Sequence, residues 1–197
     1  MDILLGTTNP GKVKEMKKFL TDFEATIYSL DDINKSIKEP NEPHETIEEN
    51  AFLKARYYAK QTDYITISDD GGLFINALNG WPGVKSARVA DSEQKRRQVV
   101  LKMLEKKDFG NRKASFKSCI SVYDPNREIS FSSVGETKGK ITEQPEQNII
   151  DGFGFDPIFY VNKANKTYAA MTSSEKNRVS HRGKALSVVN NFFNKFY

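Results

Sequence analysis

The chain has 197 residues, of which 38% are hydrophobic and 28% charged, a composition typical of a soluble globular protein and not of a disordered one. No apolar run approaches the roughly 20 residues of a membrane helix, and the N-terminus shows no pattern of a secretory signal. The single cysteine, Cys119, excludes an intrachain disulfide and lies in a strand-like run, so we expect a core residue and a cytoplasmic protein. The formal net charge of +4 permits an acidic partner, but no long basic block accompanies it.

Strands and helices alternate in the first part of the chain, as judged from hydrophobic periodicity and turn residues. A polar segment interrupted by prolines predicts a loop over residues 31–45. Thr46 and Glu49 then form a capping-box pattern, which marks the start of a helix. The predicted strands are 2–6, 25–30 and 64–68, and the predicted helices run from about Val13 and from Thr46 to about Gln61.

A hairpin is predicted in the middle of the chain, where two β-rich runs, 114–123 and 128–135, flank the turn Asp124-Pro125-Asn126. The remaining predicted helices begin at Asp91 or Ser92, at the Thr172 capping box, and at about residue 181, the last one ending near 196. These elements predict an α/β fold with an elongated mixed sheet flanked by helices. We expect one domain of two lobes over 1–197, with no separable linker and with the active-site cleft between the lobes.

The segment TTNPGK at residues 7–12 combines two hydroxyls, an amide and a lysine directly after the first predicted strand. A glycine-containing loop that opens a helix directs N–H groups and partial positive charge toward one point, which suits an anion. Lys12 could add a full charge. Because the P-loop spacing is missing, the segment by itself leaves open a phosphate site or a plain strand–helix turn.

The segment ISDDGG places Asp69 and Asp70 at the end of a predicted buried strand. Adjacent buried carboxylates need compensation, and Mg²⁺ is a common partner because it binds a few carboxylates together with waters and phosphates. Side chains alternate along a strand, so we expect one aspartate to bind metal and the other to hold the backbone. The alternative is an Asx-type turn in which Asp69 caps the DGG bend.

Three further segments have two interpretations each. The acidic loop EPNEPHE (39–45) could provide a metal ligand or partners for the dipole of the next helix. GFGFDPIF (152–159) could present an aromatic ring to a nucleobase, or pack into the core. The basic segment SEKNRVSHRGKAL (174–186) could bind a base edge or a phosphate, or form a solvated helix face.

Taken together and in this order, TTNPGKVKE, TIEENAFLKA, SDDGGL with NGWPGVKSAR, GFGFDPIF and EKNRVSHRGKAL resemble the inosine triphosphate pyrophosphatase family, HAM1-like enzymes that remove deaminated purine triphosphates. The resemblance runs from about residue 3 to residue 190. It implies a two-lobed α/β fold, usually a homodimer, and Mg²⁺-dependent hydrolysis of ITP, dITP or XTP to the monophosphate and pyrophosphate.

The resemblance also implies roles for single residues. Asp70 would be catalytic and would bind the metal together with Glu42, although Glu45 is a rival because the loop before TIEEN diverges from the family. Whether Asp70 acts as a base or only as a ligand stays open. The implied substrate-binding residues are Thr7, Thr8, Asn9, Pro10, Gly11, Lys12, Lys54, Gly71, Phe153, Gly154, Phe155, Asp156, Lys176, His181 and Arg182.

Two positions depart from the family pattern. Gly71 stands where the family usually has a serine, which removes one hydroxyl from the expected substrate contacts. Phe155 stands where a tyrosine is commoner, which removes a phenol oxygen. Two other functions remain as alternatives, a pyrophosphatase for modified pyrimidine triphosphates and a non-catalytic basic nucleic-acid-binding domain.

Overall fold

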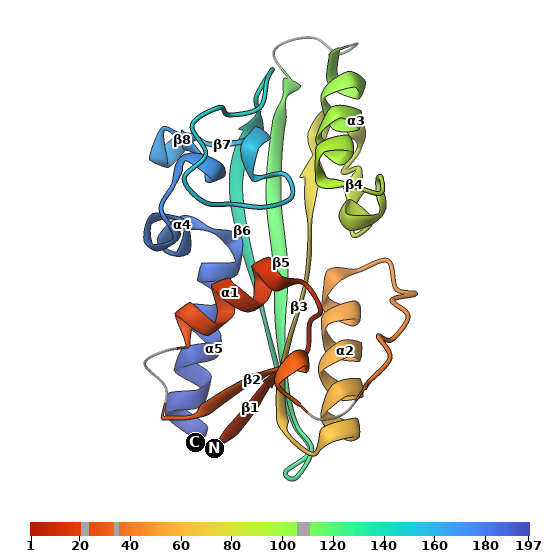
Figure 1. The fold of residues 1–197 in the computed structure, drawn as a ribbon, viewed down its shortest axis with the longest axis vertical. Coiled ribbons are helices and arrows are strands. Elements are labelled where there is room, and N and C mark those ends of the chain that lie inside the picture. Colours follow the sequence, from red (N-terminus) through yellow and green to blue (C-terminus); the bar gives the residue numbers. More distant parts are fainter. Residues whose placement is uncertain (21–23, 34–35, 106–110) are drawn as a thin grey trace. The chain divides into compact units, whose positions relative to one another are not determined.

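The computed structural model describes residues 1–20, 24–33, 36–105 and 111–197. The strands are β1 (Asp2–Leu5), β2 (Thr26–Ser29), β3 (Ile65–Ile75), β4 (Pro82–Gly83), β5 (Lys113–Asp124), β6 (Ile129–Ile141), β7 (Phe159–Val161) and β8 (Lys166–Thr167). The helices are α1 (Pro10–Phe19), α2 (Ile47–Thr62), α3 (Glu93–Glu105), α4 (Ser173–Val179) and α5 (His181–Phe196). Strands and helices alternate up to β3, whereas β5 to β8 follow one another and two helices end the chain (Figure 1).

The strands form one mixed sheet in the order β2-β1-β3-β5-β6-β7-β8, with β4 paired to β3. β1 pairs in parallel with β2 and β3, and Leu5 lies opposite Ser29 on one side and Ile67 on the other. The pairs β3–β4, β6–β7 and β7–β8 are antiparallel. The predicted α/β fold with a mixed sheet flanked by helices is therefore confirmed. Within the described ranges, no helix is both long and apolar enough to cross a membrane.

The chain divides into two compact units. Unit 1 comprises Met1–Asp70, Ser118–Gly135 and Arg182–Tyr197, and unit 2 comprises Gly71–Lys117 and Glu136–His181. Strands β3, β5 and β6 contribute residues to both units. Each unit has its own hydrophobic cluster.

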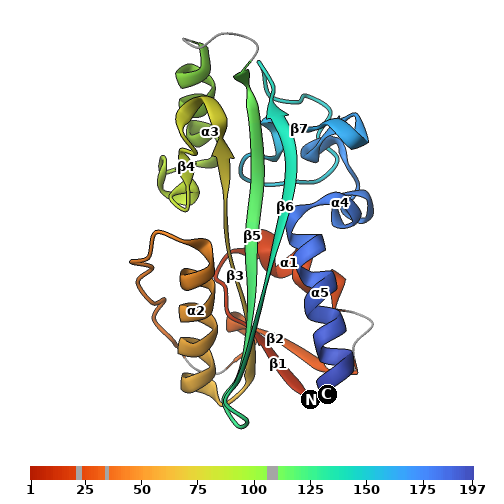
Figure 2. The ribbon, with the colours of Figure 1, turned by 180° about the vertical axis from the view of Figure 1, so that it is seen from behind.

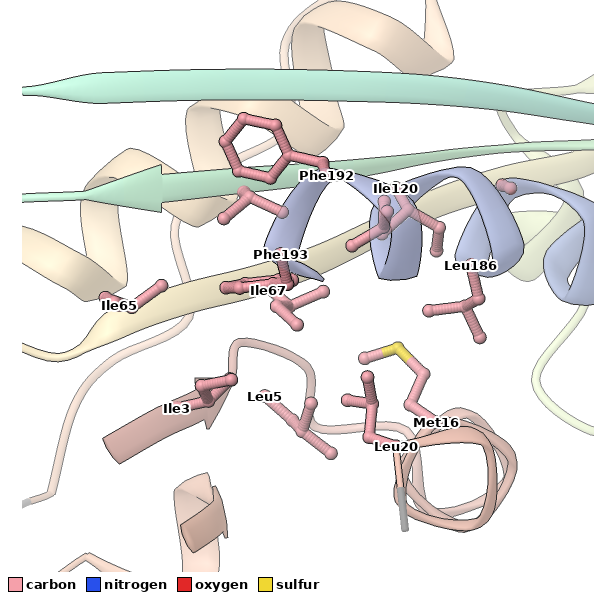
Figure 3. Close-up of a cluster of buried hydrophobic side chains, with 13 residues drawn as sticks. Ile3, Leu5, Met16, Leu20, Ile65, Ile67, Ile120, Leu186, Phe192 and Phe193 are labelled. Carbon is pink, nitrogen blue, oxygen red and sulfur yellow. The ribbon is translucent and has the colours of Figure 1, made fainter. Parts of the chain in front are cut away.

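The cluster of unit 1 joins α1 and α5 to the sheet (Figure 3). Met16 and Leu20 of the α1 segment and Leu186 and Phe193 of α5 pack with side chains of β1, β3 and β5. A second, smaller cluster contains Ala55 and Ala59 of α2 together with Tyr123 of β5. Because Ile120 and Val122 belong to the first cluster, the alternation along β5 places α2 on the opposite face from α5, as Figures 1 and 2 show.

The cluster of unit 2 is built around aromatic rings. Phe116, Phe159 and Tyr168 contact one another, with ring centroids 4.8–5.8 Å apart. Val100 and Leu104 are the buried residues of α3, and both belong to this cluster. The same cluster contains Phe155, so the loop before β7 and helix α3 are fixed to a common core.

The two helix starts predicted from capping boxes are confirmed, whereas α1 begins at Pro10, before the predicted Val13. Thr46 caps α2, with its hydroxyl accepting from the Glu49 N–H, and Thr172 and Glu175 form a complete capping box at α4. The predicted loop 31–45 is irregular in its described part after a short 3₁₀ turn, and residues 34–35 lie outside the described ranges.

The strand ends were predicted less well. β6 extends to Ile141, and β3 continues to Ile75 through Asp69-Asp70-Gly71-Gly72. The Asx-turn interpretation of DDGG was therefore wrong. β4 pairs with Leu73 and Phe74, directly after the glycines, and a Cβ on Gly72 would lie 2.0 Å from the Gly83 carbonyl oxygen.

Candidate active site

The TTNPGK loop of unit 1 connects β1 to α1 and forms the start of that helix. The Asn9 side chain caps α1 by accepting from the Lys12 N–H at 3.1 Å, and Pro10 takes the first helical position. The Thr7 hydroxyl accepts from the Asn9 N–H at 3.3 Å. The loop therefore presents helix N-terminal N–H groups together with hydroxyls, as an anion site requires.

Asp69 lies at the centre of a buried charge cluster in unit 1. Its Oδ2 is 2.9 Å from Lys12 Nζ and 3.0 Å from Arg182 Nη2. Arg182 also contacts Glu15 of α1. Burial alone would raise the pKa of Asp69, but the positive charges of Arg182 and Lys12 outweigh it and hold the pKa well below its usual range. Asp69 is therefore an ionised group that fixes Lys12 and Arg182.

Asp70 has different partners, as alternation along β3 predicts. Its Oδ1 lies 3.4 Å from Lys54 Nζ, and its Oδ2 accepts from Asn50 Nδ2 at 3.5 Å. Burial raises the pKa of Asp70 despite the opposing charge of Lys54. We predicted that the other aspartate would hold the backbone. This prediction is wrong, because the Asp69 carboxylate binds the charged side chains of Lys12 and Arg182.

Lys54 of α2 joins Asp70 to the acidic loop. Its ammonium contacts Glu42 as well as Asp70. Burial lowers the pKa of Lys54, but the charges of Asp70 and Glu42 more than compensate, so the pKa is raised and the side chain stays charged. Glu45, the rival metal ligand, is exposed. Glu42 and Asp70 therefore both lie at the Lys54 ammonium group.

Asn50 was not predicted as a site residue, although it anchors the acidic loop to α2. Its Oδ1 accepts from the His44 N–H at 3.1 Å, and its Nδ2 donates to the His44 carbonyl at 3.0 Å. The same amide reaches Asp70. The sequence signal was present in the motif TIEEN, but periodicity does not distinguish a buried polar residue that binds a loop from a polar residue on the helix surface.

The carboxylate oxygens in unit 1 suit a hard cation that takes only some of its ligands from the protein. Among the described residues, no three His, Cys, Asp or Glu side chains come together as a metal site. Two carboxylates, Glu42 and Asp70, lie against the same ammonium group. Mg²⁺ is commonly held by one or two carboxylates, with waters and substrate phosphates completing its shell. The residues present therefore fit this ion when it arrives with a phosphate.

In unit 2, the loop Gly152–Asp156 is organised by a buried ion pair. Asp156 Oδ2 accepts from the Phe153 N–H at 2.8 Å and lies 2.7 Å from Lys176 Nζ. The same ammonium lies 4.7 Å from the centroid of the Phe153 ring, a cation–π distance. Phe153 is half-buried, whereas Phe155 is buried in the core cluster. Only Phe153 thus keeps the partial exposure that a stacking surface needs.

His181 is held by aromatic side chains of unit 2. Its ring stacks on Phe116 with centroids 4.8 Å apart and planes 10° from parallel, and Nδ1 lies 3.5 Å from the Tyr168 hydroxyl. His181 is 4% exposed, and Lys176 and Arg182 are similarly buried at 3% and 5%. The interpretation of this segment as a solvated basic face is therefore wrong for these three residues, and it holds only for exposed Arg178 and Lys184.

Cys119 lies outside this chemistry. It is fully buried on β5, and burial raises the pKa of its thiol to about 11, so the thiolate is scarce at neutral pH. The prediction of a core residue is confirmed.

Comparison with known proteins places these residues in a family. The model of the Ham1 family matches residues 3–192. The chain belongs to the Ham1 family. The dITP/XTP pyrophosphatase of Thermoanaerobacter sp. is 41% identical over 99% of this chain and 98% of its own length, and that of Bacillus cereus is 42% identical over 93% and 90%. The predicted resemblance is confirmed.

Solved Ham1 structures share the fold. The HAM1 protein from Coxiella burnetii superimposes with a TM-score of 0.87 at 36% identity, and the two chains cover 99% of each other. The Ham1 protein of Staphylococcus aureus superimposes with a TM-score of 0.83 at 31% identity, and the alignment covers 100% of each chain. As a Ham1 family member, this protein has relatives that are named for pyrophosphatase activity and that match it over nearly its whole length.

Proposed function

We propose that this Ham1 family protein is a nucleoside triphosphate pyrophosphatase that hydrolyses ITP, dITP and XTP to the monophosphate and pyrophosphate, and so removes deaminated purines from the nucleotide pool. The observation that carries the proposal is that two carboxylates, those of Glu42 and Asp70, contact the Lys54 ammonium. A buried carboxylate of raised pKa, Asp70, and a second carboxylate, Glu42, lie at one ammonium in the unit that also carries the TTNPGK helix start. Relatives named dITP/XTP pyrophosphatase support the choice of base.

Unit 1 is proposed to bind the triphosphate. The α1 N-terminus and the Thr7, Thr8 and Asn9 side chains hydrogen-bond to phosphate oxygens, and Lys12 and Lys54 neutralise charge. When bound, Mg²⁺ would be held by Glu42 and Asp70 and would add to the charge neutralisation of the phosphate oxygens. Lys12 is already fixed by Asp69, so its charge is positioned before the substrate arrives.

Asp70 is proposed to accept a proton from the attacking water. The water oxygen forms a bond to phosphorus, its proton passes to the carboxylate, and the phosphoanhydride bond breaks so that pyrophosphate leaves with the bonding electron pair. Asn50 and Lys54 hold the carboxylate in place.

Unit 2 is proposed to bind the base. The Phe153 ring offers a stacking surface, and His181 offers a hydrogen-bond donor to the oxygen at position 6 of hypoxanthine or xanthine. Adenine presents an amine at that position and would leave the donor unpaired. The Arg182 guanidinium is already paired with Asp69 and Glu15, so these contacts account for its burial without a base. A contact between Arg182 and the base stays a prediction.

The same proposal extends to the whole molecule. We infer that residues 1–197 act as a single pyrophosphatase domain in the cytoplasm, and that two copies form a homodimer, as the family resemblance implies. Nucleic acid and membrane are not among the proposed partners.

A product assay tests the proposed function. The purified protein is incubated with Mg²⁺ and ITP, with a modified pyrimidine triphosphate in parallel, and pyrophosphate and orthophosphate are measured separately. We expect pyrophosphate from ITP and little from the pyrimidine. Orthophosphate as the product, or a preference for the pyrimidine, would contradict the proposal. Salt-dependent nucleic-acid binding without any turnover would favour the basic binding domain instead.

A further inference from the structure

A side chain of α3 holds the backbone of the Gly152–Asp156 loop. Arg97 Nη1 donates to the Gly154 carbonyl at 2.7 Å, although the two residues are 57 positions apart in the chain. Glu93, one turn earlier on α3, lies 3.9 Å from the same nitrogen, and the Arg97 side chain is only 19% exposed. The bond is therefore charge-assisted and largely shielded from solvent, two conditions that strengthen a hydrogen bond.

Gly154, at the middle of this loop, has no side-chain contact that could hold it. Its φ of +60° lies in the left-handed region, and a Cβ built on it would meet no atom within 4 Å. The residue has no side chain with which to pack, so its backbone carbonyl is the group through which it can be held. Gly154 also lies directly between Phe153 and Phe155, whose rings have different environments.

The two ends of the loop are held by other contacts. At one end, the Ile150 N–H donates to the Ala169 carbonyl at 2.8 Å. At the other end, Asp156 accepts from the Phe153 N–H and binds Lys176. The Arg97 bond acts between these anchors, on the residue that directly follows Phe153.

Helix α3 is a rigid support for this bond. Val100 and Leu104, one and two turns after Arg97, are buried in the unit 2 cluster, with 0% and 1% of their surface exposed. Phe155 is buried in the same cluster. Helix and loop thus share one core, and the planar guanidinium has little freedom to leave the carbonyl.

We propose that Arg97 is a positioning residue for the purine ring, acting through the Gly154 carbonyl to set the place of the Phe153 ring. The inference rests on the proposed function, in which Phe153 stacks on the base. Arg97 would not touch the substrate. Its loss should therefore weaken binding of the base and leave the phosphate chemistry of unit 1 intact.

The test compares Arg97→Ala with Arg97→Lys and with a matched control, Arg96→Ala. Arg96 is the adjacent arginine of the same helix, and its Nε donates to the Ala90 carbonyl at 2.9 Å, away from the loop. The control therefore removes the same charge and a similar backbone bond. For Arg97→Ala we expect KM for ITP to rise roughly tenfold with kcat within about twofold, because a displaced Phe153 ring loses part of a base-stacking free energy of about 1–3 kcal/mol.

Two inhibitors separate the base from the phosphates. Inhibition by inosine monophosphate should weaken in Arg97→Ala by a factor similar to that of KM, whereas inhibition by inorganic tripolyphosphate should be unchanged. Arg97→Lys should recover part of the loss, and Arg96→Ala should match the wild type in all three quantities. Unchanged KM and inhibition in Arg97→Ala, or equal losses in Arg96→Ala, would overturn the inference.

Failure of the proposed function would look different. A wild-type protein that neither turns over ITP nor binds inosine monophosphate by calorimetry would contradict the proposed function, and with it this role of Arg97. A wild-type protein that does both, paired with an Arg97→Ala variant that differs only in thermal stability, would contradict the positioning role alone.

Discussion

Asp69 and Asp70 are identical side chains on adjacent positions of β3, yet the fold gives them opposite electrostatics. Asp69 faces two positive groups, Lys12 and Arg182, and its pKa is lowered. Asp70 faces one shared ammonium, that of Lys54, and its burial raises the pKa. The strand period of two residues is the cause, because it places neighbouring side chains on opposite faces. Asp69 thus balances the charges of Lys12 and Arg182, and the proposed chemistry is assigned to Asp70.

Substitution by asparagine should separate the two roles. At pH 7 in EDTA, Asp69→Asn should lower Tm, since it removes the carboxylate that pairs with Lys12 and with buried Arg182, and Arg182 then keeps Glu15 as its counter-charge. The cost of about 3–5 kcal/mol for a broken buried pair corresponds to roughly 6–20 °C. Asp70→Asn should raise Tm by a few °C while reducing kcat by a factor of at least about 10². Calorimetry and turnover on both variants check this, and a stability loss in Asp70→Asn would contradict it.

The pH dependence of stability has opposite signs for the two groups. The ionised form of Asp69 stabilises the fold above the unfolded-state pKa of about 3.9, and this stabilisation is lost as the pH falls toward the lower pKa of the folded state. For Asp70 the pKa is raised, so its ionisation destabilises the fold as the pH rises from about 3.9 through the folded-state pKa. The Tm gain of Asp70→Asn should therefore shrink in acid. A gain that persists at pH 3 would contradict the assignment.

The choice between Glu42 and Glu45 is also testable at single residues. Glu42 contacts Lys54, whereas Glu45 is exposed, so Glu42→Gln should raise the Mg²⁺ concentration needed for half-maximal turnover by about tenfold or more. Glu45→Gln, the matched control from the same loop, should leave this concentration unchanged. A Mg²⁺ titration of both variants decides the matter, and the reverse order of effects would assign the ligand to Glu45.

At the scale of elements, the helix starts could be read from the sequence and the strand ends could not. A cap is a local interaction within four residues, so Thr46 and Thr172 identify their helices without any knowledge of the rest of the chain. The far end of β3 pairs with strands that come later in the sequence, β4 at Leu73 and Phe74 and β5 along the sheet. The glycines after Asp70 resemble a turn until that pairing is known.

The close approach of β3 and β4 gives a prediction for Gly72. A methyl group there would lie 2.0 Å from the Gly83 carbonyl oxygen, a backbone atom that cannot turn aside. Gly72→Ala should therefore destabilise the protein by about 1–3 kcal/mol, the range of overpacking, and lower Tm by roughly 2–12 °C. Thermal unfolding measures the effect. An unchanged Tm would show that β4 can move away from β3 at little cost.

At the scale of the whole molecule, the sequence predicted the fold class, the family and most of the groups that gather in each unit. It did so because the motifs are contiguous, so their order along the chain was visible. Asn50 and Arg97 were missed because each acts on a segment that its own neighbours do not reveal. Asn50 binds the backbone of a preceding loop, and Arg97 binds a carbonyl 57 positions away. Long-range contacts of a single polar side chain leave no periodic signal.

Burial was the other property that the sequence did not provide. Lysine and arginine are usually exposed, yet the exposed fractions of Lys54, Lys176 and Arg182 are only 3–5%. Each forms an ion pair with a carboxylate from a distant part of the chain, which offsets the cost of leaving water. A basic segment can therefore be buried whenever the fold brings acidic partners to it.

This protein is proposed to select deaminated purine triphosphates. The most direct test is the ratio of kcat/KM for ITP to kcat/KM for ATP, measured on the wild-type protein with Mg²⁺ and with pyrophosphate as the product. A donor aimed at the oxygen of position 6 predicts a ratio on the order of 10⁴, because the amine of adenine leaves that donor unpaired. A ratio near 1 would contradict the claim and would mean that the protein hydrolyses purine triphosphates without reading this position of the base.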